Sequence, residues 1–186
     1  FMKEFGDALT VVAQNIGITI QCAEGVRPVR TLGRSADITG NTVRASVNQL
    51  YAQHTKYILL EMELPESAAG TDRQIATVNA SYTNMLTNNA EAKDQYATVS
   101  YVADPAMVEA RLDRDTAGEV VRQIANEKMM YGMTLFDEGR IDEATAWFSK
   151  NEQYLLENAS RLNRPDLNVD AQSNGSLTIH WNPGDW

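Results

Sequence analysis

Acidic side chains gather between residues 135 and 152, and their spacing is the first in this chain to suggest chemistry. Two adjacent pairs flank Gly139-Arg140 and one further acid follows: Asp137, Glu138, Asp142, Glu143 and Glu152. A calcium loop needs oxygen ligands at alternating positions over about twelve residues, whereas these acids occur as neighbours. Carboxylates in the first turn of a helix are favoured by the helix dipole and by free backbone N–H groups. We therefore interpret the stretch as a solvated turn between two helices; a hydrolase that pairs Asp137 or Glu143 with a base is an alternative.

The other reactive side chains form no recognisable catalytic or metal-binding motif. His54 and His180 are far apart and lack the HxxxH or HExxH spacing of a metal site. The single cysteine, Cys22, allows no intrachain disulfide and lies on the apolar face of an expected strand, which favours a small buried hydrophobe. Gly-rich phosphate loops and a GxSxG elbow are absent. The sequence therefore predicts no catalytic residue, no metal ligand and no cofactor in this chain, and a protein that is not an enzyme.

The charge balance argues against two classes of partner. The 186 residues carry a net charge of −9, and the pI is about 4.7. Nucleic-acid binders need a basic face that displaces counterions from phosphates, and anionic membranes attract basic segments. A run of about 18 apolar residues, as a spanning helix requires, does not occur. We therefore expect no nucleic-acid partner and no membrane insertion by this chain.

The pattern of residues 1–104 predicts a short helix followed by a β-sandwich domain. Residues 1–13 place apolar side chains at helical spacing. In NIGITIQC the apolar residues recur at every second position, which places Ile16, Ile18, Ile20 and Cys22 on one face of a strand. Gly40-Asn41 separates two β-compatible arms, which is typical of a hairpin. About seven such runs with turn residues between them predict a seven-stranded antiparallel sandwich.

Residues 105–164 predict a long α-helical hairpin. Asp104-Pro105 is a favourable helix start, and Gly139 is suited to the C′ position after the first helix. The charged cluster 113–115 and Gly118 are expected to bend or interrupt that helix. The second helix ends before Arg164-Pro165.

The last segment, residues 165–186, is expected to form a β-hairpin, which completes an α+β fold. Leu167, Val169 and Ala171 alternate, and Asn174-Gly175 is suited to a type I′ turn. A second alternating arm then contains Leu177, Ile179 and Trp181. An isolated two-stranded hairpin is marginal in water, so this tail is expected to pair with a sheet edge or to pack on the helices.

Four aromatic residues are candidates for a partner-binding surface. Tyr131, Trp147 and Tyr154 occur at helical spacings in the expected helical hairpin, and Trp181 lies in the expected tail. Apolar residues at these spacings also form ordinary helix–helix interfaces, which is the competing interpretation.

Two stretches resemble a known family. FGDALTVVAQNIGITIQCAEGVRPVR, with the later NQLYAQHTKYILLEMELP, resembles the segment downstream of the von Willebrand factor type A domain in bacterial proteins often called Ca-activated chloride channel-like. The stretch from DPAMVEARLD to LFDEGRIDEATAWFSKNEQYL resembles the helical hairpin that closes many of those proteins. Its DEGR-x-DEA turn is also similar to one tetratricopeptide-type hairpin. The resemblance covers roughly residues 1–162.

The resemblance implies a non-catalytic accessory or interaction region that orients or supports a metal-binding type A domain. The adhesion site of that domain needs Asp-x-Ser-x-Ser, which this chain lacks, so the domain is expected upstream of Phe1 and the chain is expected to be a fragment. The implied partners are that upstream domain or another protein. The Met-rich amphipathic helices add a homodimer as a further expected assembly. The sequence leaves the compartment open, with the bacterial cell envelope or periplasm slightly favoured over the cytoplasm. The alternative is a peptide- or protein-binding module that uses the tetratricopeptide-like hairpin.

Overall fold

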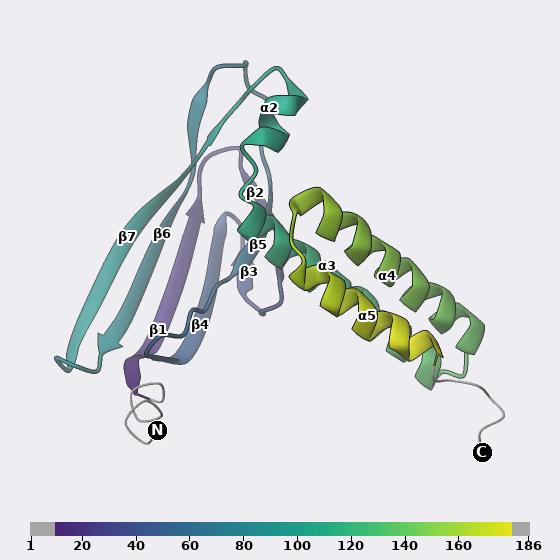
Figure 1. Ribbon diagram of the computed structural model, residues 1–186. Helices are drawn as coiled ribbons and strands as arrows, with labels where there is room; N and C mark the ends of the chain where they lie inside the picture. The colour runs from purple at the N-terminus through teal and green to yellow at the C-terminus, as the bar shows by residue number, and fades with distance from the viewer. Residues whose placement is uncertain (1–9, 180–186) are drawn as a thin grey trace. The chain divides into compact units, whose positions relative to one another are not determined.

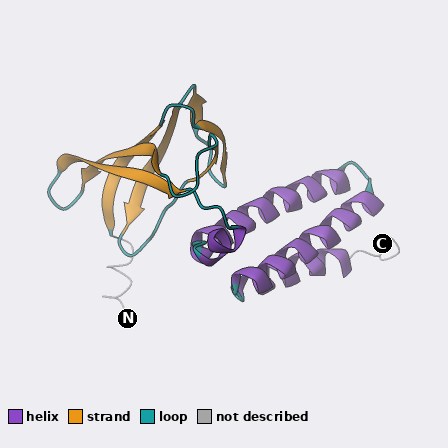
Figure 2. Ribbon diagram, turned by 90° about the horizontal axis from the view of Figure 1, so that it is seen from above, coloured by secondary structure: helices purple, strands orange, loops and turns teal. Residues whose placement is uncertain are grey.

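The computed structural model describes residues 10–179, and the packing of the chain divides it into two compact units. The first unit is Phe1–Val108 and the second is Glu109–Trp186. The described strands all belong to the first unit, and the three long helices all belong to the second (Figure 1, Figure 2). The α+β class with an antiparallel sheet, which the sequence predicts, is confirmed.

The strands of the first unit form two antiparallel sheets. The larger sheet has five strands in the order β3-β4-β1-β6-β7, namely β3 (Asp37–Thr39), β4 (Thr42–Tyr51), β1 (Val11–Cys22), β6 (Asp72–Asn84) and β7 (Asn89–Ser100). The smaller sheet pairs β2 (Arg27–Leu32) with β5 (Leu59–Glu63). The seven strands therefore divide into five and two, so the expected sandwich is only partly matched.

The central strand of the larger sheet follows from its period-two pattern. Ile18 of β1 lies between Ala45 of β4 and Ala80 of β6, and β-branched side chains pack well on such a pleated surface. The hairpin predicted at Gly40-Asn41 is confirmed, since β3 and β4 pair across it. Gly40 has a φ of +57°, which a residue without a Cβ adopts at little cost.

A small apolar core joins the two sheets. Cys22, Val26 and Ile75 are buried, and partly buried side chains pack against them from β5 and β7: Leu60, Met62, Ala97 and Val99. The prediction that Cys22 is a buried hydrophobe is confirmed, because only 4% of it is exposed. Burial also raises the pKa of the Cys22 thiol, which disfavours the reactive thiolate.

The helix expected over residues 1–13 falls mostly outside the described residues. Its last part is wrong, because Val11 and Val12 belong to β1. Val11 pairs with Tyr51 of β4, so the sheet determines the conformation at this point.

The second unit contains three long helices, which a short helix precedes. The bounds are α2 (Pro105–Ala110), α3 (Arg114–Asp137), α4 (Ile141–Leu162) and α5 (Asp166–Ile179). The predicted interruption at 113–115 is confirmed: Asp113 caps α3 by accepting the backbone N–H groups of Asp115 and Thr116 at 3.0 and 3.1 Å. Gly139, with a φ of +77°, follows the end of α3 as predicted.

The C-terminal β-hairpin predicted for residues 165–186 is wrong over the described residues, where the chain forms α5. Leu167 and Ala171, four residues apart, are 0% exposed, whereas Val169 between them is 63% exposed. This is the period of a helix that packs one face, and it is incompatible with a strand. Among the described residues, no helix is both long and apolar enough to cross a membrane.

Candidate functional site

The acidic turn between α3 and α4 is held by one arginine. Arg140 donates from Nε and Nη2 to the two carboxylate oxygens of Glu143 at 2.8 and 2.7 Å, and from Nη1 to Glu138 at 3.0 Å. These hydrogen bonds lower the pKa of the Glu143 carboxyl. In both ion pairs, the arginine and the glutamate side chains are about half exposed, so this turn lies at the surface. Of the five acids that the sequence singles out, Glu138 and Glu143 are therefore held around Arg140.

Three of the four aromatic candidates lie along the contact between α3 and α4. Tyr131 of α3 meets Trp147 of α4 edge to face, with 5.1 Å between ring centroids. One turn earlier on α3, the Lys128 ammonium lies 3.5 Å from the centroid of the Tyr154 ring. We call Lys128, Tyr131, Trp147 and Tyr154 the aromatic seam. Trp181 lies outside the described residues.

The aromatic seam is partly structural and partly exposed. Trp147 packs against the buried cluster of Leu135, Ala144 and Phe148, and Tyr154 packs against a second buried cluster further along the helices. Tyr131 remains 47% exposed. Burial lowers the pKa of Lys128 and raises that of Tyr154. The seam therefore offers an exposed aromatic edge on a rigid support, which is a suitable contact for an apolar side chain.

A glycine sets the distance between α3 and α4 beneath this seam. A Cβ on Gly132 would lie 2.6 Å from Cε1 and 3.0 Å from Cδ1 of Phe148, whose ring is buried. Helix propensity favours alanine over glycine by about 1 kcal/mol, whereas overpacking a core costs about 1–3 kcal/mol. We expect Gly132→Ala to lower the free energy of unfolding of the helical unit, measured by urea denaturation. Met133→Ala, at a position 51% exposed, is the matched control, and a variant more stable than wild type would contradict this packing.

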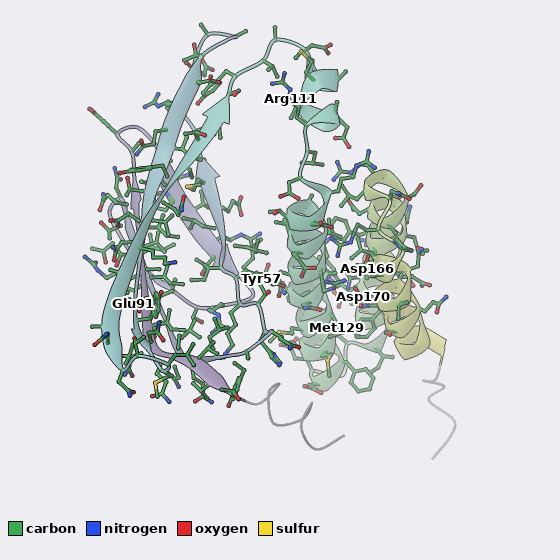
Figure 3. All side chains as sticks on the ribbon, turned by 60° about the vertical axis from the view of Figure 1, so that its left-hand side comes forward. Tyr57, Glu91, Arg111, Met129, Asp166 and Asp170 are labelled. Carbon is green, nitrogen blue, oxygen red and sulfur yellow. The ribbon has the colours of Figure 1, made fainter. Side chains whose placement is uncertain are left out.

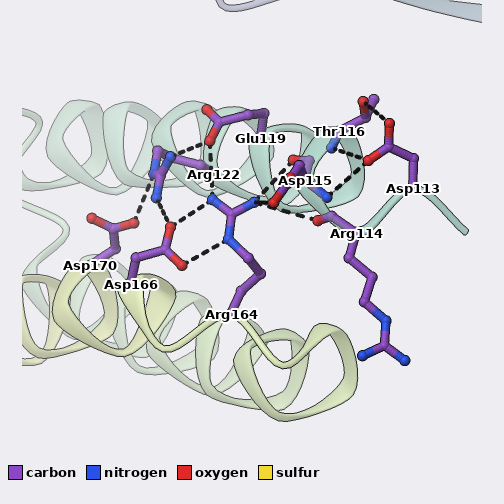
Figure 4. A network of polar contacts seen from close by, with 9 residues as sticks. All are labelled: Asp113, Arg114, Asp115, Thr116, Glu119, Arg122, Arg164, Asp166 and Asp170. Carbon is purple, nitrogen blue, oxygen red and sulfur yellow. Dashed lines mark hydrogen bonds and ion pairs between the residues drawn. The ribbon is translucent and has the colours of Figure 1, made fainter.

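A network of ion pairs, which sequence reasoning missed, joins α3 to the α4–α5 turn and to α5 (Figure 4). Arg164 donates from Nε and Nη2 to both oxygens of Asp166 at 2.8 and 2.7 Å, and from Nη2 to Glu119 at 3.2 Å. Arg122 donates to Glu119 at 2.5 Å, to Asp170 at 2.9 Å and also to Asp166. Figure 3 shows Asp166 and Asp170 on α5. We call Glu119, Arg122, Arg164, Asp166 and Asp170 the charged clasp.

The charged clasp has the composition of a structural ion-pair network. Its two guanidinium groups are each held by more than one carboxylate, which leaves them committed to partners within the unit. A Cβ on Gly118 would lie 2.8 Å from Cζ of Arg164, so the absent side chain gives the guanidinium its place against α3. The clasp therefore fastens α5 to α3 rather than offering a free cation to a ligand.

The clasp predicts a dependence of stability on pH. The hydrogen bonds from Arg164, together with those from Arg122, lower the pKa of Asp166 although partial burial opposes them. A depressed carboxyl pKa stabilises the fold above the unfolded-state pKa of about 4, and this contribution is lost as pH falls below that value. Since Asp166 is 41% exposed, we expect a modest effect. Asp166→Asn should lower the melting temperature at neutral pH, and the difference from wild type should shrink on acidification; a pH-independent difference would contradict it.

Two asparagines form a buried polar contact among the three helices. Nδ2 of Asn151 donates to the carbonyl of Ala125 at 2.9 Å and to Oδ1 of Asn174 at 2.8 Å. Nδ2 of Asn174 in turn donates to the carbonyl of Asp170 at 3.0 Å. Asn151 is 0% exposed and Asn174 is 6% exposed, so each bond is made away from bulk water. Oδ1 of Asn151 is buried without a hydrogen-bond partner among the described residues. The three bonds still favour one position of α5 along α3 and α4, because a helix that slips by one turn would break them.

The remaining candidates do not assemble into a reactive centre in the described part of the chain. His54 lies edge to face with Tyr51 at 5.9 Å between ring centroids. His180 is outside the described residues. Within residues 10–179, no three histidine, cysteine or acidic side chains are placed so that they could hold a metal ion.

Neither a protein-family model nor a curated protein matches the chain. Among solved structures, the chain is similar to a protein described as "von Willebrand factor type A from Catenulispora acidiphila", with a TM-score of 0.62 and 11% identity. This match covers 85% of the chain and 39% of that protein. A second match, the ArnB paralog VWA2 from Sulfolobus acidocaldarius, has a TM-score of 0.40 and 18% identity over 87% of this chain and 38% of that one.

The likeness to the Catenulispora protein is a likeness of fold. The chain thus has a fold that occurs within a protein described as von Willebrand factor type A. It spans less than half the length of both proteins that it matches.

Proposed function

We propose that this chain is a non-catalytic accessory region of a von Willebrand factor type A protein, which supports or orients the metal-binding domain of that protein. One observation carries the proposal: the fold likeness extends over 85% of this chain but only 39% of the Catenulispora protein. Most of that protein therefore has no counterpart here. A type A adhesion site needs Asp-x-Ser-x-Ser, and the sequence contains no such motif. The metal-binding domain would accordingly be a separate part of the same polypeptide, upstream of Phe1.

The sequence of the gene product upstream of Phe1 tests this proposal. We expect a domain that carries Asp-x-Ser-x-Ser after a strand. If that domain is present, its melting temperature should rise when residues 1–186 follow it in one polypeptide, because a supporting region binds the folded state. An upstream sequence without the motif, or a domain whose melting is unaffected, would overturn the proposal.

A second candidate function is peptide binding at the aromatic seam. The observation that favours it is the edge-to-face pair of Tyr131 and Trp147, in which Tyr131 stays 47% exposed on a rigid support. Aromatic side chains of this kind are enriched among the residues that dominate binding energy.

Selection of peptides from a displayed library tests the second candidate. Selected peptides should lose about tenfold or more in affinity for Tyr131→Ala, which is the size expected of a dominant contact. Leu156→Ala is the control, since Leu156 is also exposed, at 45%, and does not belong to the seam. Equal affinity for both variants would show that the seam is not the site.

A further inference from the structure

Strand β7 forms a long edge of the larger sheet. It has twelve residues and pairs with β6 along its whole length, from Asn84↔Asn89 to Asp72↔Ser100. It is last in the strand order, and within residues 10–179 no other strand pairs with its outer side (Figure 1). The opposite edge of the sheet is β3, which has only three residues. Long edge strands present a row of unpaired N–H and C=O groups, and short ones present few.

The charges on this edge are placed so that they disfavour most partners. Glu91, Lys93 and Asp94 occupy the first half of β7, and Figure 3 shows Glu91 on this strand. Charged side chains on an edge oppose indiscriminate strand pairing, because an incoming strand that lacks matching charges leaves them poorly paired. Glu91 and Lys93 are two residues apart, so their side chains point to the same face of the sheet. A strand that offers Lys and Glu in the reverse order would match them.

A second copy of β7 offers this order. We propose that two copies of this chain pair through antiparallel β7 strands centred on Ala92, so that Glu91 lies opposite the partner subunit's Lys93, and Lys93 lies opposite the partner subunit's Glu91. The two five-stranded sheets then form one continuous sheet across a two-fold axis. Opposite charges at facing positions stabilise a strand pair, and like charges destabilise it. A two-fold interface makes each favourable contact twice.

Geometry and charge together select this register. Residues that face each other across two antiparallel strands have their side chains on the same face of the sheet. When the two strands are copies of one sequence, this condition is met only if the two-fold axis passes beside a residue, which then faces its own copy. A centre at Glu91, Lys93 or Asp94 would place a charge opposite its own copy. A centre at Gln95 would place Lys93 opposite an alanine and Asp94 opposite a tyrosine, without an ion pair. Among the centres from 91 to 95, only Ala92 produces opposite-charge pairs.

In the present structure, two hydrogen bonds already orient the Glu91 side chain for this contact. Its carboxylate accepts from Tyr82 Oη at 2.8 Å and from Asn84 Nδ2 at 2.7 Å, which holds the side chain on the face that it shares with Lys93. The hydrogen bond from Tyr82 lowers the pKa of Glu91, so the group is ionised near neutral pH. An ionised carboxylate has about four acceptor sites, and the neutral donors of Tyr82, Asn84 and, more weakly, Thr87 leave room for an ammonium group. The part of β7 that pairs with the second copy in this register is short. The interface therefore buries a small surface area, below about 1,200 Å², and we expect the dimer to dissociate reversibly.

Cysteine cross-linking tests the register directly. In the proposed dimer, the Cα atoms at position 92 and at its copy are about 4.5–5.5 Å apart, within the range that a disulfide bridges. Ala90→Cys is the matched control, since Ala90 is also exposed but would lie opposite the partner subunit's Asp94, roughly 14 Å from its own copy. The native Cys22 is buried and remains in both variants.

Under mild oxidation, Ala92→Cys should yield a covalent dimer of twice the chain mass, while Ala90→Cys stays monomeric. Adding Lys93→Glu to the Ala92→Cys variant should reduce the dimer yield severalfold, because four carboxylates then face one another. Equal cross-linking at positions 90 and 92 would indicate random collisions and overturn the proposal. So would an absence of dimer at position 92, or a yield that Lys93→Glu leaves unchanged. Circular dichroism of each variant establishes that the sheet is intact.

Discussion

Replacing Leu155 by alanine is expected to lower the free energy of unfolding of the helical unit by about 2–5 kcal/mol. Leu155 is 0% exposed and belongs to the buried cluster that α3, α4 and α5 share: Val121, Ala125, Leu155, Ala159, Leu162, Leu167 and Ala171. Three members of this cluster are alanines, so little side-chain volume surrounds Leu155 that could move into the space it leaves. The loss therefore combines the transfer of an isobutyl group with the cost of a cavity.

The neighbouring leucine is a control of identical chemistry. Leu156 is 45% exposed, and the same substitution there is expected to change stability by no more than about 0.5 kcal/mol. Tryptophan fluorescence during urea denaturation reports on the helical unit alone, since Trp147, Trp181 and Trp186 are all within Glu109–Trp186. Equal midpoints for Leu155→Ala and Leu156→Ala would contradict the position of the core.

Local patterns predicted the parts of the fold that local interactions determine. The helix that ends before Gly139, the interruption at 113–115 and the hairpin at Gly40-Asn41 all depend on residues within a few positions of each other. Capping and turn residues act over this range, which is why their sequence patterns are informative. The same holds for the acidic turn, where Arg140 contacts acids two and three residues away.

The division of the strands into sheets could not be predicted in this way. β1 pairs with β4 and β6 in the larger sheet, while β2 lies outside that sheet and pairs with β5. Alternation specifies that a strand has an apolar face but does not specify its partner, which depends on contacts between residues distant in the chain. The charged clasp was missed for the same reason: Arg122 lies 44 residues before its partner Asp166.

The aromatic part of the candidate site was predictable to a greater extent. Helical spacing placed Tyr131, Trp147 and Tyr154 on the helical hairpin, and the structure brings the first two into contact. Spacing did not reveal the two lysines of the unit, Lys128 and Lys150, whose ammonium groups lie over Tyr154 and, more distantly, Trp147. Those contacts depend on how the two helices pack against each other, which includes the close approach of Gly132 to Phe148.

The error at the C-terminus arose from two competing patterns in one segment. Leu167, Val169 and Ala171 satisfy alternation, but Leu167, Ala171 and Asn174 also satisfy helical spacing. Pro165 directly before α5 and the acid Asp166 in its first turn are both common at helix starts and could have decided the matter. In the helix, Asn174-Gly175 serves close packing: a Cβ on Gly175 would lie 2.6 Å from Oε1 of Glu152.

Substitutions at Leu167 and Val169 distinguish the helix from the hairpin. In the helix, Leu167 is 0% exposed within the buried cluster of the three helices, and Val169 is 63% exposed. Leu167→Ala is therefore expected to cost about 2–5 kcal/mol of unfolding free energy. Val169→Ala should change stability by about 0.5 kcal/mol or less, and in the stabilising direction, because alanine has the higher helix propensity.

A strand would treat the two positions alike, since residues two apart share a face. Similar losses at Leu167 and Val169, measured by the fluorescence of the helical unit in urea, would therefore restore the hairpin and remove the basis for α5. If Leu167→Ala loses more stability than Val169→Ala, the helix content of the Leu167→Ala variant becomes informative. Without Leu167, the Asn151–Asn174 contact and the clasp would still hold α5 in register, so the variant should keep its helical circular dichroism while unfolding at lower urea. A loss of helix content in the native variant would instead mean that Leu167 is required for α5 to fold, since its remaining polar contacts would be too weak to offset the entropy of ordering it.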